Sequence, residues 1–161
     1  MSTRMLVVVF SGQEGAVVEG LPALLATARA DRRQVRLAYF QPIPPPRRDR
    51  HDRIVVDTDR EMARVSERAT GALTAALREL GLDPVDIVVR FGSPSLEVLR
   101  ETDVFTPDLV AFFSPPARAL ATRLRVWALR RRVARRQARL LVVETPGLGR
   151  RLRAEPALAL S

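Results

Sequence analysis

Short runs of apolar residues, rich in valine, leucine and phenylalanine, recur along the chain between longer amphipathic segments. Five such runs occupy residues 5–10, 35–40, 85–90, 109–113 and 140–143. Runs of four to eight apolar residues are typical of strands that are buried on both faces of a parallel sheet. The pattern therefore predicts five buried strands.

The segments between these runs predict helices. After Ser11-Gly12, apolar positions with helical spacing continue to about Ala30, and Pro22 marks either a kink in this helix or its start. Residues 58–80 carry a cleaner apolar stripe. Thr58 followed by Glu61 predicts a capping box at the start of this second helix, and Gly81 supplies a left-handed position after its end.

A third helix is expected after the strand at 85–90. Ser93 is its predicted capping residue and Pro94 its first helical residue, while Leu96 and Leu99 are expected on its buried side. The segment 117–139 predicts a fourth helix with two apolar stripes on nearly opposite sides. Two stripes indicate that this segment bends, or that one stripe meets the sheet and the other a partner.

Strands that alternate with helices predict an α/β fold: an open, five-stranded parallel sheet with helices on both faces. We expect one domain over residues 1–147 and a peripheral tail over 148–161. Residues 42–57, with four prolines followed by RRDRHDR, are expected to be a poorly ordered loop over the sheet edge.

One stretch resembles the universal stress protein family. The family pattern is G-x-P, an apolar residue four positions on, then D-L-[IV]-V, and Gly92, Pro94, Val98 and Asp108-Leu109-Val110 match it. The resemblance extends over roughly residues 5–144. It implies strand order 3-2-1-4-5, with the switch point between strands 1 and 4.

In such a sheet, ligands bind beyond the carboxyl ends of the strands at the switch point. The candidate cleft residues are Ser11, Gly12, Gln41, Gly92, Phe113 and Ser114.

The resemblance also implies where an ATP site would lie. Family members that bind ATP have an aspartate after strand 1 and, after strand 4, the pattern G-x-x-G, nine intervening residues and then G-[ST]. In this chain these positions hold Ser11, Phe113, Pro116, Val126 and Trp127. Glycines allow backbone N–H groups to approach phosphates, and their loss predicts a member without an ATP site.

The charge of the chain is concentrated in one segment. All 27 basic residues are arginine, and the net charge is +9. Residues 117–139 hold nine arginines and no acid, which leaves 18 arginines against 18 acidic residues elsewhere. The simplest interpretation is a solvated helix whose arginines pair with neighbouring acids, such as Glu97 and Glu101. The alternative is an anion-binding surface at Arg130, Arg131, Arg132, Arg135 and Arg136.

No catalytic constellation is recognisable in the sequence. The chain has no cysteine, and its one histidine, His51, lies in the Arg/Asp-rich stretch and is expected to be a solvated loop residue. No group of residues has metal-ligand spacing. We therefore expect a protein that is not an enzyme and needs no cofactor or metal.

These observations favour a cytoplasmic, non-enzymatic homodimer with a regulatory or protective role in stress response. Leu140, Leu141, Val142 and Val143 would form an apolar edge strand, which family members commonly pair about a two-fold axis. A polyanion-binding module that uses residues 117–139 is the alternative, with nucleic acid, a nucleotide-like ligand or an anionic surface as partner. A nucleotide hydrolase is a third reading that the loop substitutions oppose. No apolar run is long enough to cross a membrane.

Overall fold

The computed structural model describes residues 3–113, 120–136, 138–143 and 153–154, with only the backbone for 120–126 and 153–154. The helices are α1 (Glu14–Ala30), α2 (Thr58–Glu79), α3 (Pro94–Phe105) and α4 (Leu120–Ala134). The strands are β1 (Arg4–Phe10), β2 (Gln34–Gln41), β3 (Arg47–Arg48), β4 (Ile54–Val56), β5 (Asp86–Phe91), β6 (Leu109–Phe113), β7 (Arg139–Val143) and β8 (Arg153–Ala154).

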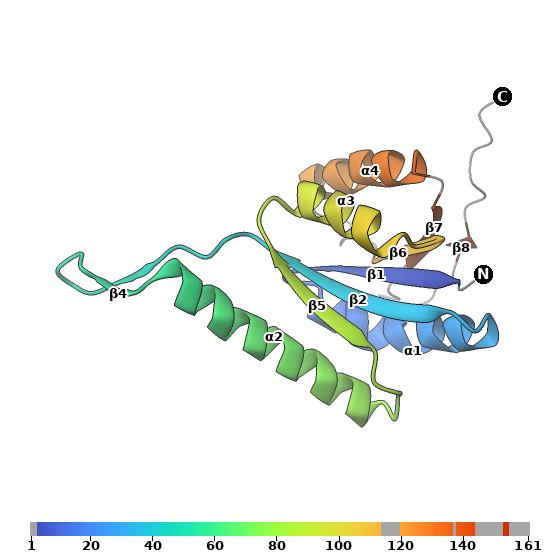
Figure 1. Cartoon of the computed structure of the whole chain (residues 1–161), viewed down its shortest axis with the longest axis horizontal. Helices are drawn as coiled ribbons and strands as arrows, with labels where there is room; N and C mark the ends of the chain where they lie inside the picture. The colour runs from blue at the N-terminus through green and yellow to red at the C-terminus, as the bar shows by residue number, and fades with distance from the viewer. Residues whose placement is uncertain (1–2, 114–119, 137, 144–152, 155–161) are drawn as a thin grey trace.

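The main sheet has the order β5-β2-β1-β6-β7-β8, and its first five strands are parallel (Figure 1). Counted among the parallel strands alone, this is the predicted order 3-2-1-4-5, and all five predicted strands are present. Helices cover both faces of the sheet, so the predicted α/β class is confirmed.

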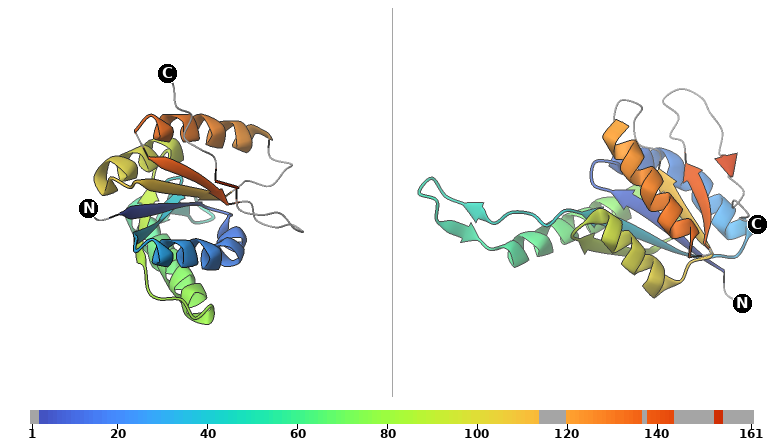
Figure 2. Two further views of the ribbon diagram at one scale, coloured as in Figure 1. Left: turned by 90° about the vertical axis from the view of Figure 1, so that its right-hand side faces the viewer. Right: turned by 90° about the horizontal axis from the view of Figure 1, so that it is seen from above.

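Two apolar cores lie on the two faces of the sheet. Along β1, alternate side chains enter opposite cores: Met5, Val7 and Val9 face α1 and α2, while Leu6 and Val8 face α3 and α4. All five are fully buried. In the left view of Figure 2, α3 and α4 lie on one side of the strands, and α1 and α2 lie on the other.

Local sequence signals correctly predict most helix boundaries, and the differences from the prediction lie mainly at the helix starts. α1 begins at Glu14 and contains Pro22. The residue that caps α2 is Asp57 rather than the predicted Thr58, because the Asp57 carboxylate accepts the N–H of Arg60 at 2.8 Å. Gly81 has φ +64°, as predicted, and follows the end of α2.

The predicted start of α3 is correct, but its details differ. Ser93 holds the capping position without a side-chain hydrogen bond to the helix. Leu96 is 53% exposed, so it is not on the buried side. That side is formed instead by Val98 and Phe105, together with the polar residues Glu101 and Thr102.

Residues 42–57 are not the predicted loop over the sheet edge. β3 and β4 form an antiparallel hairpin that projects away from the sheet (Figure 1, Figure 2). Its turn is closed by Asp49, whose carboxylate accepts the N–H groups of His51 at 2.7 Å and Arg53 at 3.0 Å. A short carboxylate that satisfies two backbone donors explains why a polar stretch adopts a defined turn. His51 is exposed, as expected.

The edge formed by β7 differs from the sequence expectation. β8 pairs antiparallel with β7, with Leu141 opposite Ala154 and Val142 opposite Arg153. Part of the edge that the sequence assigned to a second copy is thus paired with the tail of the same chain.

Asp108, from the D-L-V motif, joins the amino ends of β1 and β6. Its carboxylate accepts the N–H of Arg4 at 2.6 Å and forms an ion pair with Arg33. Burial by itself raises the pKa of Asp108, but the hydrogen bonds from Arg33 and Arg4 outweigh it and lower the pKa. The motif therefore has a structural role, which is to hold two central strands in register.

A buried carboxylate lies beneath α3. Glu101 is 1% exposed, and its two oxygens bind the guanidinium groups of Arg36 on β2 and Arg90 on β5, each at 2.8 Å. Arg36 also stacks on the Phe105 ring, 4.4 Å from its centroid. Glu101 thus forms ion pairs with two strands of the sheet rather than with the basic segment 117–139.

We expect the Arg36→Met/Arg90→Met double variant to lose about 3–5 kcal/mol of unfolding free energy, because the Glu101 carboxylate stays buried without a cation. Adding Glu101→Met should restore most of this loss, since an apolar triad of similar volume avoids the desolvation cost. Urea unfolding followed by circular dichroism measures both values. Equal stability of the double and triple variants would contradict the assignment.

Candidate functional site

The carboxyl ends of β1, β2 and β5 lie together at one edge of the sheet. The N–H of Ser11 bonds to the carbonyl of Phe40, and the N–H of Gly92 to the carbonyl of Gln41, each at 3.0 Å. These bonds extend the sheet ladders by one residue and bring Ser11, Gln41 and Gly92 to the same edge. Three of the predicted cleft residues thus lie at one edge, as the parallel topology requires.

The two glycines of this edge adopt backbone conformations with positive φ. Gly12 has φ +87° and Gly92 has φ +141°, conformations that residues with a Cβ rarely adopt. A Cβ on Gly92 would also lie 3.2 Å from Cγ of Glu97 in α3. The turn from β5 into α3 is therefore sufficient to explain Gly92.

Gln13 lies at the switch point between β1 and β6. Its side-chain oxygen accepts the N–H of Phe10 at 3.2 Å, and its Nε2 donates to the carbonyl of Phe113 at 3.5 Å. One amide side chain thus connects the carboxyl ends of the two strands, where a ligand would enter. The sequence analysis did not single out Gln13, although its place two residues after Ser11 is a usable signal.

Glu14 and Tyr39 form a second contact at this edge that the sequence analysis missed. Oε1 of Glu14 accepts the Tyr39 hydroxyl at 2.6 Å and the N–H of Gly12 at 3.2 Å. Burial by itself raises the pKa of Glu14, but the bonds from Tyr39 and from the N–H groups of Glu14 and Gly12 lower it overall. Burial and the neighbouring carboxylate raise the pKa of Tyr39. The first turn of α1 therefore carries a negative charge.

The residues that replace the family's ATP motif lie in different surroundings. Phe113 is buried under α1, close enough to Gly20 that a Cβ there would lie 2.8 Å from its ring. Trp127 is 53% exposed on α4. Ser114 and Pro116 lie outside the described residues, and Val126 is described only by its backbone.

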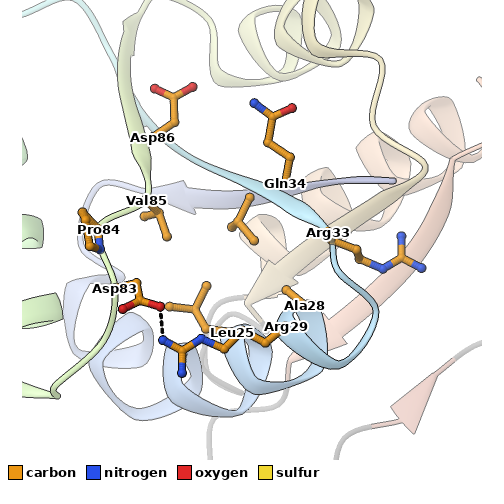
Figure 3. A pocket seen from close by; sticks show the side chains of 10 residues that line it. Leu25, Ala28, Arg29, Arg33, Gln34, Asp83, Pro84, Val85 and Asp86 are labelled. Atoms are coloured by element: carbon orange, nitrogen blue, oxygen red, sulfur yellow. Dashed lines mark hydrogen bonds and ion pairs between the residues drawn. The ribbon is translucent and has the colours of Figure 1, made fainter. Parts of the chain in front are cut away.

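A pocket of about 350 Å³ lies at the opposite end of the sheet, where β2 and β5 begin (Figure 3). Its walls come from the end of α1, the start of β2 and residues 83–86. Arg29 and Asp83 form an ion pair across it, and Asp86 is paired with Arg36 at 2.6 Å. A charged ligand would have to compete with these ion pairs, so the pocket is a weaker candidate site than its volume suggests.

Comparisons with known proteins give a structural match. No family model and no curated protein matches the sequence. A crystal structure of a universal stress protein in complex with cAMP matches with a TM-score of 0.54 and 19% identity, covering 89% of this chain and 99% of that chain. The fold is that of a universal stress protein. A universal stress protein family member from Burkholderia pseudomallei gives a TM-score of 0.44 at 16% identity, over 88% and 95% of the two chains.

On this universal stress protein fold, α4 packs through one of its two predicted stripes. Leu129 and Val133 are buried against the sheet, whereas Trp127 faces out and lies 4.7 Å beneath the guanidinium of Arg131. The interpretation in which one stripe meets the sheet thus holds for these residues, and the helix ends at Ala134, before the predicted 139.

The arginines of the candidate anion surface have different environments. Arg136 binds both oxygens of Asp103 on α3, at 2.5 and 3.0 Å. The prediction that Glu97 and Glu101 pair with these arginines was wrong. Glu97 binds Arg100, and Glu101 binds Arg36 and Arg90. The other members of the candidate anion surface lie on α4 or just after it: Arg130, Arg131, Arg132 and Arg135.

The described residues contain no group of three or more histidine, cysteine or acidic side chains placed to hold a metal ion. Among the helices in the described ranges, none is long and apolar enough to span a membrane.

We expect Tyr39→Phe to lower the unfolding free energy by about 1 kcal/mol at pH 7, a modest value because Glu14 is exposed and its charge is screened. A carboxyl group with a lowered folded pKa contributes stability above its unfolded pKa of about 4.3 and loses it as pH falls through the folded value. The effect of Tyr39→Phe should therefore shrink below about pH 4.

The measurement is thermal or urea unfolding between pH 3 and 7 of wild type, Tyr39→Phe, Glu14→Gln and the double variant. The double-mutant cycle isolates the pair from the separate effect of Glu14 on the helix terminus. A coupling energy near zero at pH 7 would contradict the contact.

Proposed function

We propose that the protein is a non-enzymatic, universal-stress-protein-like protein that does not bind ATP. It works in the cytoplasm as a homodimer that regulates or protects other proteins under stress. One observation supports this most directly: the Gln13 side chain joins β1 to β6 at the switch point, and the Glu14 carboxylate accepts the N–H of Gly12 at the same edge of the sheet.

Phosphate binding at such an edge needs free backbone N–H groups and a positive potential. Here the N–H of Gly12 already donates to Glu14, and the N–H of Phe10 already donates to Gln13. A phosphate entering this edge would meet the Glu14 carboxylate instead of an open helix terminus. This argument from the start of α1 is independent of the substitutions at Ser11, Phe113, Pro116, Val126 and Trp127.

One of the matching universal stress proteins was crystallised in complex with cAMP. That ligand carries a phosphate, so the same electrostatic argument applies to it in this chain. We therefore include cAMP among the nucleotides that the protein should not bind tightly.

Calorimetric titration with ATP and Mg²⁺, and separately with cAMP, should show no binding tighter than about 100 μM, a free energy of roughly 5.5 kcal/mol. A micromolar dissociation constant for either nucleotide would refute the proposal. The same titrations on Glu14→Gln test the role of Gln13. This variant removes the negative charge but keeps Gln13 at the switch point, so we expect that it still does not bind either nucleotide tightly.

The homodimer was first predicted through Leu140–Val143 at the end of the sheet. Pairing of a second copy there requires β8 to leave Leu141 and Val142.

A second candidate function, polyanion binding by α4, is favoured by the exposed Trp127–Arg131 pair. An aromatic ring beside arginines offers both stacking and charge to a nucleic acid. Arg132 and Arg135 are exposed, and neither forms an ion pair with a carboxylate in the described residues. Arg136, by contrast, is paired with Asp103.

If the surface neutralises five duplex phosphates, the logarithm of affinity should fall with the logarithm of salt concentration at a slope of about −4.5. The binding of a labelled duplex and of anionic vesicles is measured from low to physiological salt. One variant changes the surface to glutamine at Arg130, Arg131, Arg132, Arg135 and Arg136. A charge-matched control changes five exposed arginines elsewhere: Arg60, Arg64, Arg68, Arg78 and Arg100. Equal losses in the two variants, or no salt-sensitive binding by wild type, would reject a specific surface.

A further inference from the structure

The two edges of the sheet are not equivalent. On one side β8 pairs with β7, whereas on the other side β5 is the outermost strand, and no strand in the described ranges pairs with its outer edge (Figure 1). A strand of six residues, Asp86–Phe91, thus presents a row of backbone donors and acceptors without sheet partners on that side.

The middle of β5 lacks the features that protect exposed edges. Ile87, Val88 and Val89 are β-branched and apolar, and all three are only partly buried. The strand contains no proline, and its register with β2 is unbroken from Asp86 to Phe91. Edge strands that remain unpaired usually carry a charge, a proline or a bulge near the centre.

The helix beside this edge is also incompletely covered. α2 lies along β5 on one face of the sheet (Figure 1). Its apolar stripe buries only Leu73 and Leu77 fully, while Met62, Val65 and Ala69 remain partly exposed. An uncovered helix stripe and an unpaired strand therefore adjoin at the same border of the molecule.

We propose that a second copy of this chain pairs with β5 in antiparallel orientation and extends the sheet across a two-fold axis. The inference names the interface of the proposed homodimer, and so rests on it. In an antiparallel pair, directly opposite side chains point to the same face of the sheet. Because side chains alternate along a strand, two opposite residues of identical strands are both even-numbered or both odd-numbered, and the sum of their numbers is even. With Val88 on the axis, Asp86 lies opposite Arg90 of the second copy, and Ile87 lies opposite its Val89.

This register places opposite charges directly across from each other, at about 4.5–5.5 Å between Cβ atoms. The two-fold axis repeats the pair, so each interface contains it twice. Moving the axis to Ile87 or Val89 leaves Asp86 and Arg90 opposite apolar residues or residues outside the strand. Charge complementarity therefore selects one register and one occupant, a second copy of this strand.

The atoms needed for this pair are available. Asp86 uses Oδ2 to accept from Arg36 at 2.6 Å, and Arg90 uses Nε and Nη2 to bind Glu101. Oδ1 of Asp86 and Nη1 of Arg90 make no hydrogen bond with the described residues. The second copy would extend the buried network around Glu101 without breaking any of its bonds.

Because the chain has no cysteine, single cysteines test this interface directly. Val88→Cys should form a disulfide-linked dimer on mild oxidation, since directly opposite Cα atoms lie roughly 4.5–5.5 Å apart, within disulfide range. Ile87→Cys and Val89→Cys should cross-link poorly. With Val88 on the axis, the two copies of either cysteine lie two residues apart along the strands and not directly opposite each other. Val104→Cys, on an α3 residue that is 69% exposed, is the surface control.

Light scattering of wild type at micromolar concentration should give twice the monomer mass. Val88→Lys should halve that mass by placing two like charges across the axis, with circular dichroism showing that the fold is kept, and Val104→Lys should leave the mass unchanged. If Val88→Lys does not fold, cross-linking decides.

A monomeric wild type would overturn both this interface and the proposed homodimer. A dimeric wild type that cross-links through Leu141→Cys or Val142→Cys but not through Val88→Cys would overturn this interface alone. Cross-linking that is strongest at Ile87→Cys or Val89→Cys would overturn the register and the charge pairing on which it rests. None of these results bears on nucleotide binding, which the titration tests separately.

Discussion

Every side chain from Met5 to Val9 is fully buried, and alternate ones enter opposite sides of the sheet. A strand of this kind must be covered on both faces, which requires helices above and below it and crossover connections between parallel strands. The neighbours of β1, namely β2 and β6, are held in register along its length. The positions of the helices and of both sheet edges follow from this one constraint.

Polar residues then fix how the covered strands meet. At the amino ends, Asp108 bonds to Arg4 and Arg33, so that β1 and β6 start together. Beneath α3, Glu101 holds Arg36 and Arg90 on neighbouring strands. Removing Arg36 and Arg90 would leave the Glu101 carboxylate buried without a cation, whereas the Asp108 side chain is 44% exposed and would stay solvated. The Glu101 ion pairs therefore hold α3 over β2 and β5.

At the carboxyl ends, the same topology creates the crevice in which universal stress protein folds and other open α/β sheets accept ligands. In this chain Gln13 and Glu14 satisfy the backbone groups of that crevice from within. Two other surfaces of the described residues are open to a macromolecule: the outer edge of β5, which has no strand partner there, and α4 with its exposed Trp127 and Arg131.

The local pattern of the sequence determined the five buried strands and the end of α2 at Gly81. The strand order and the loss of the ATP motif were implied by the family resemblance, which local pattern alone does not supply. The sequence did not determine which charges pair: Glu101 was expected to meet the basic segment, but it binds Arg36 and Arg90. Nor did it predict Gln13 across the switch point or β8 on β7. Polar partners have no periodicity along a chain, so distant contacts of this kind are decided only when the packed strands and helices place the groups within reach.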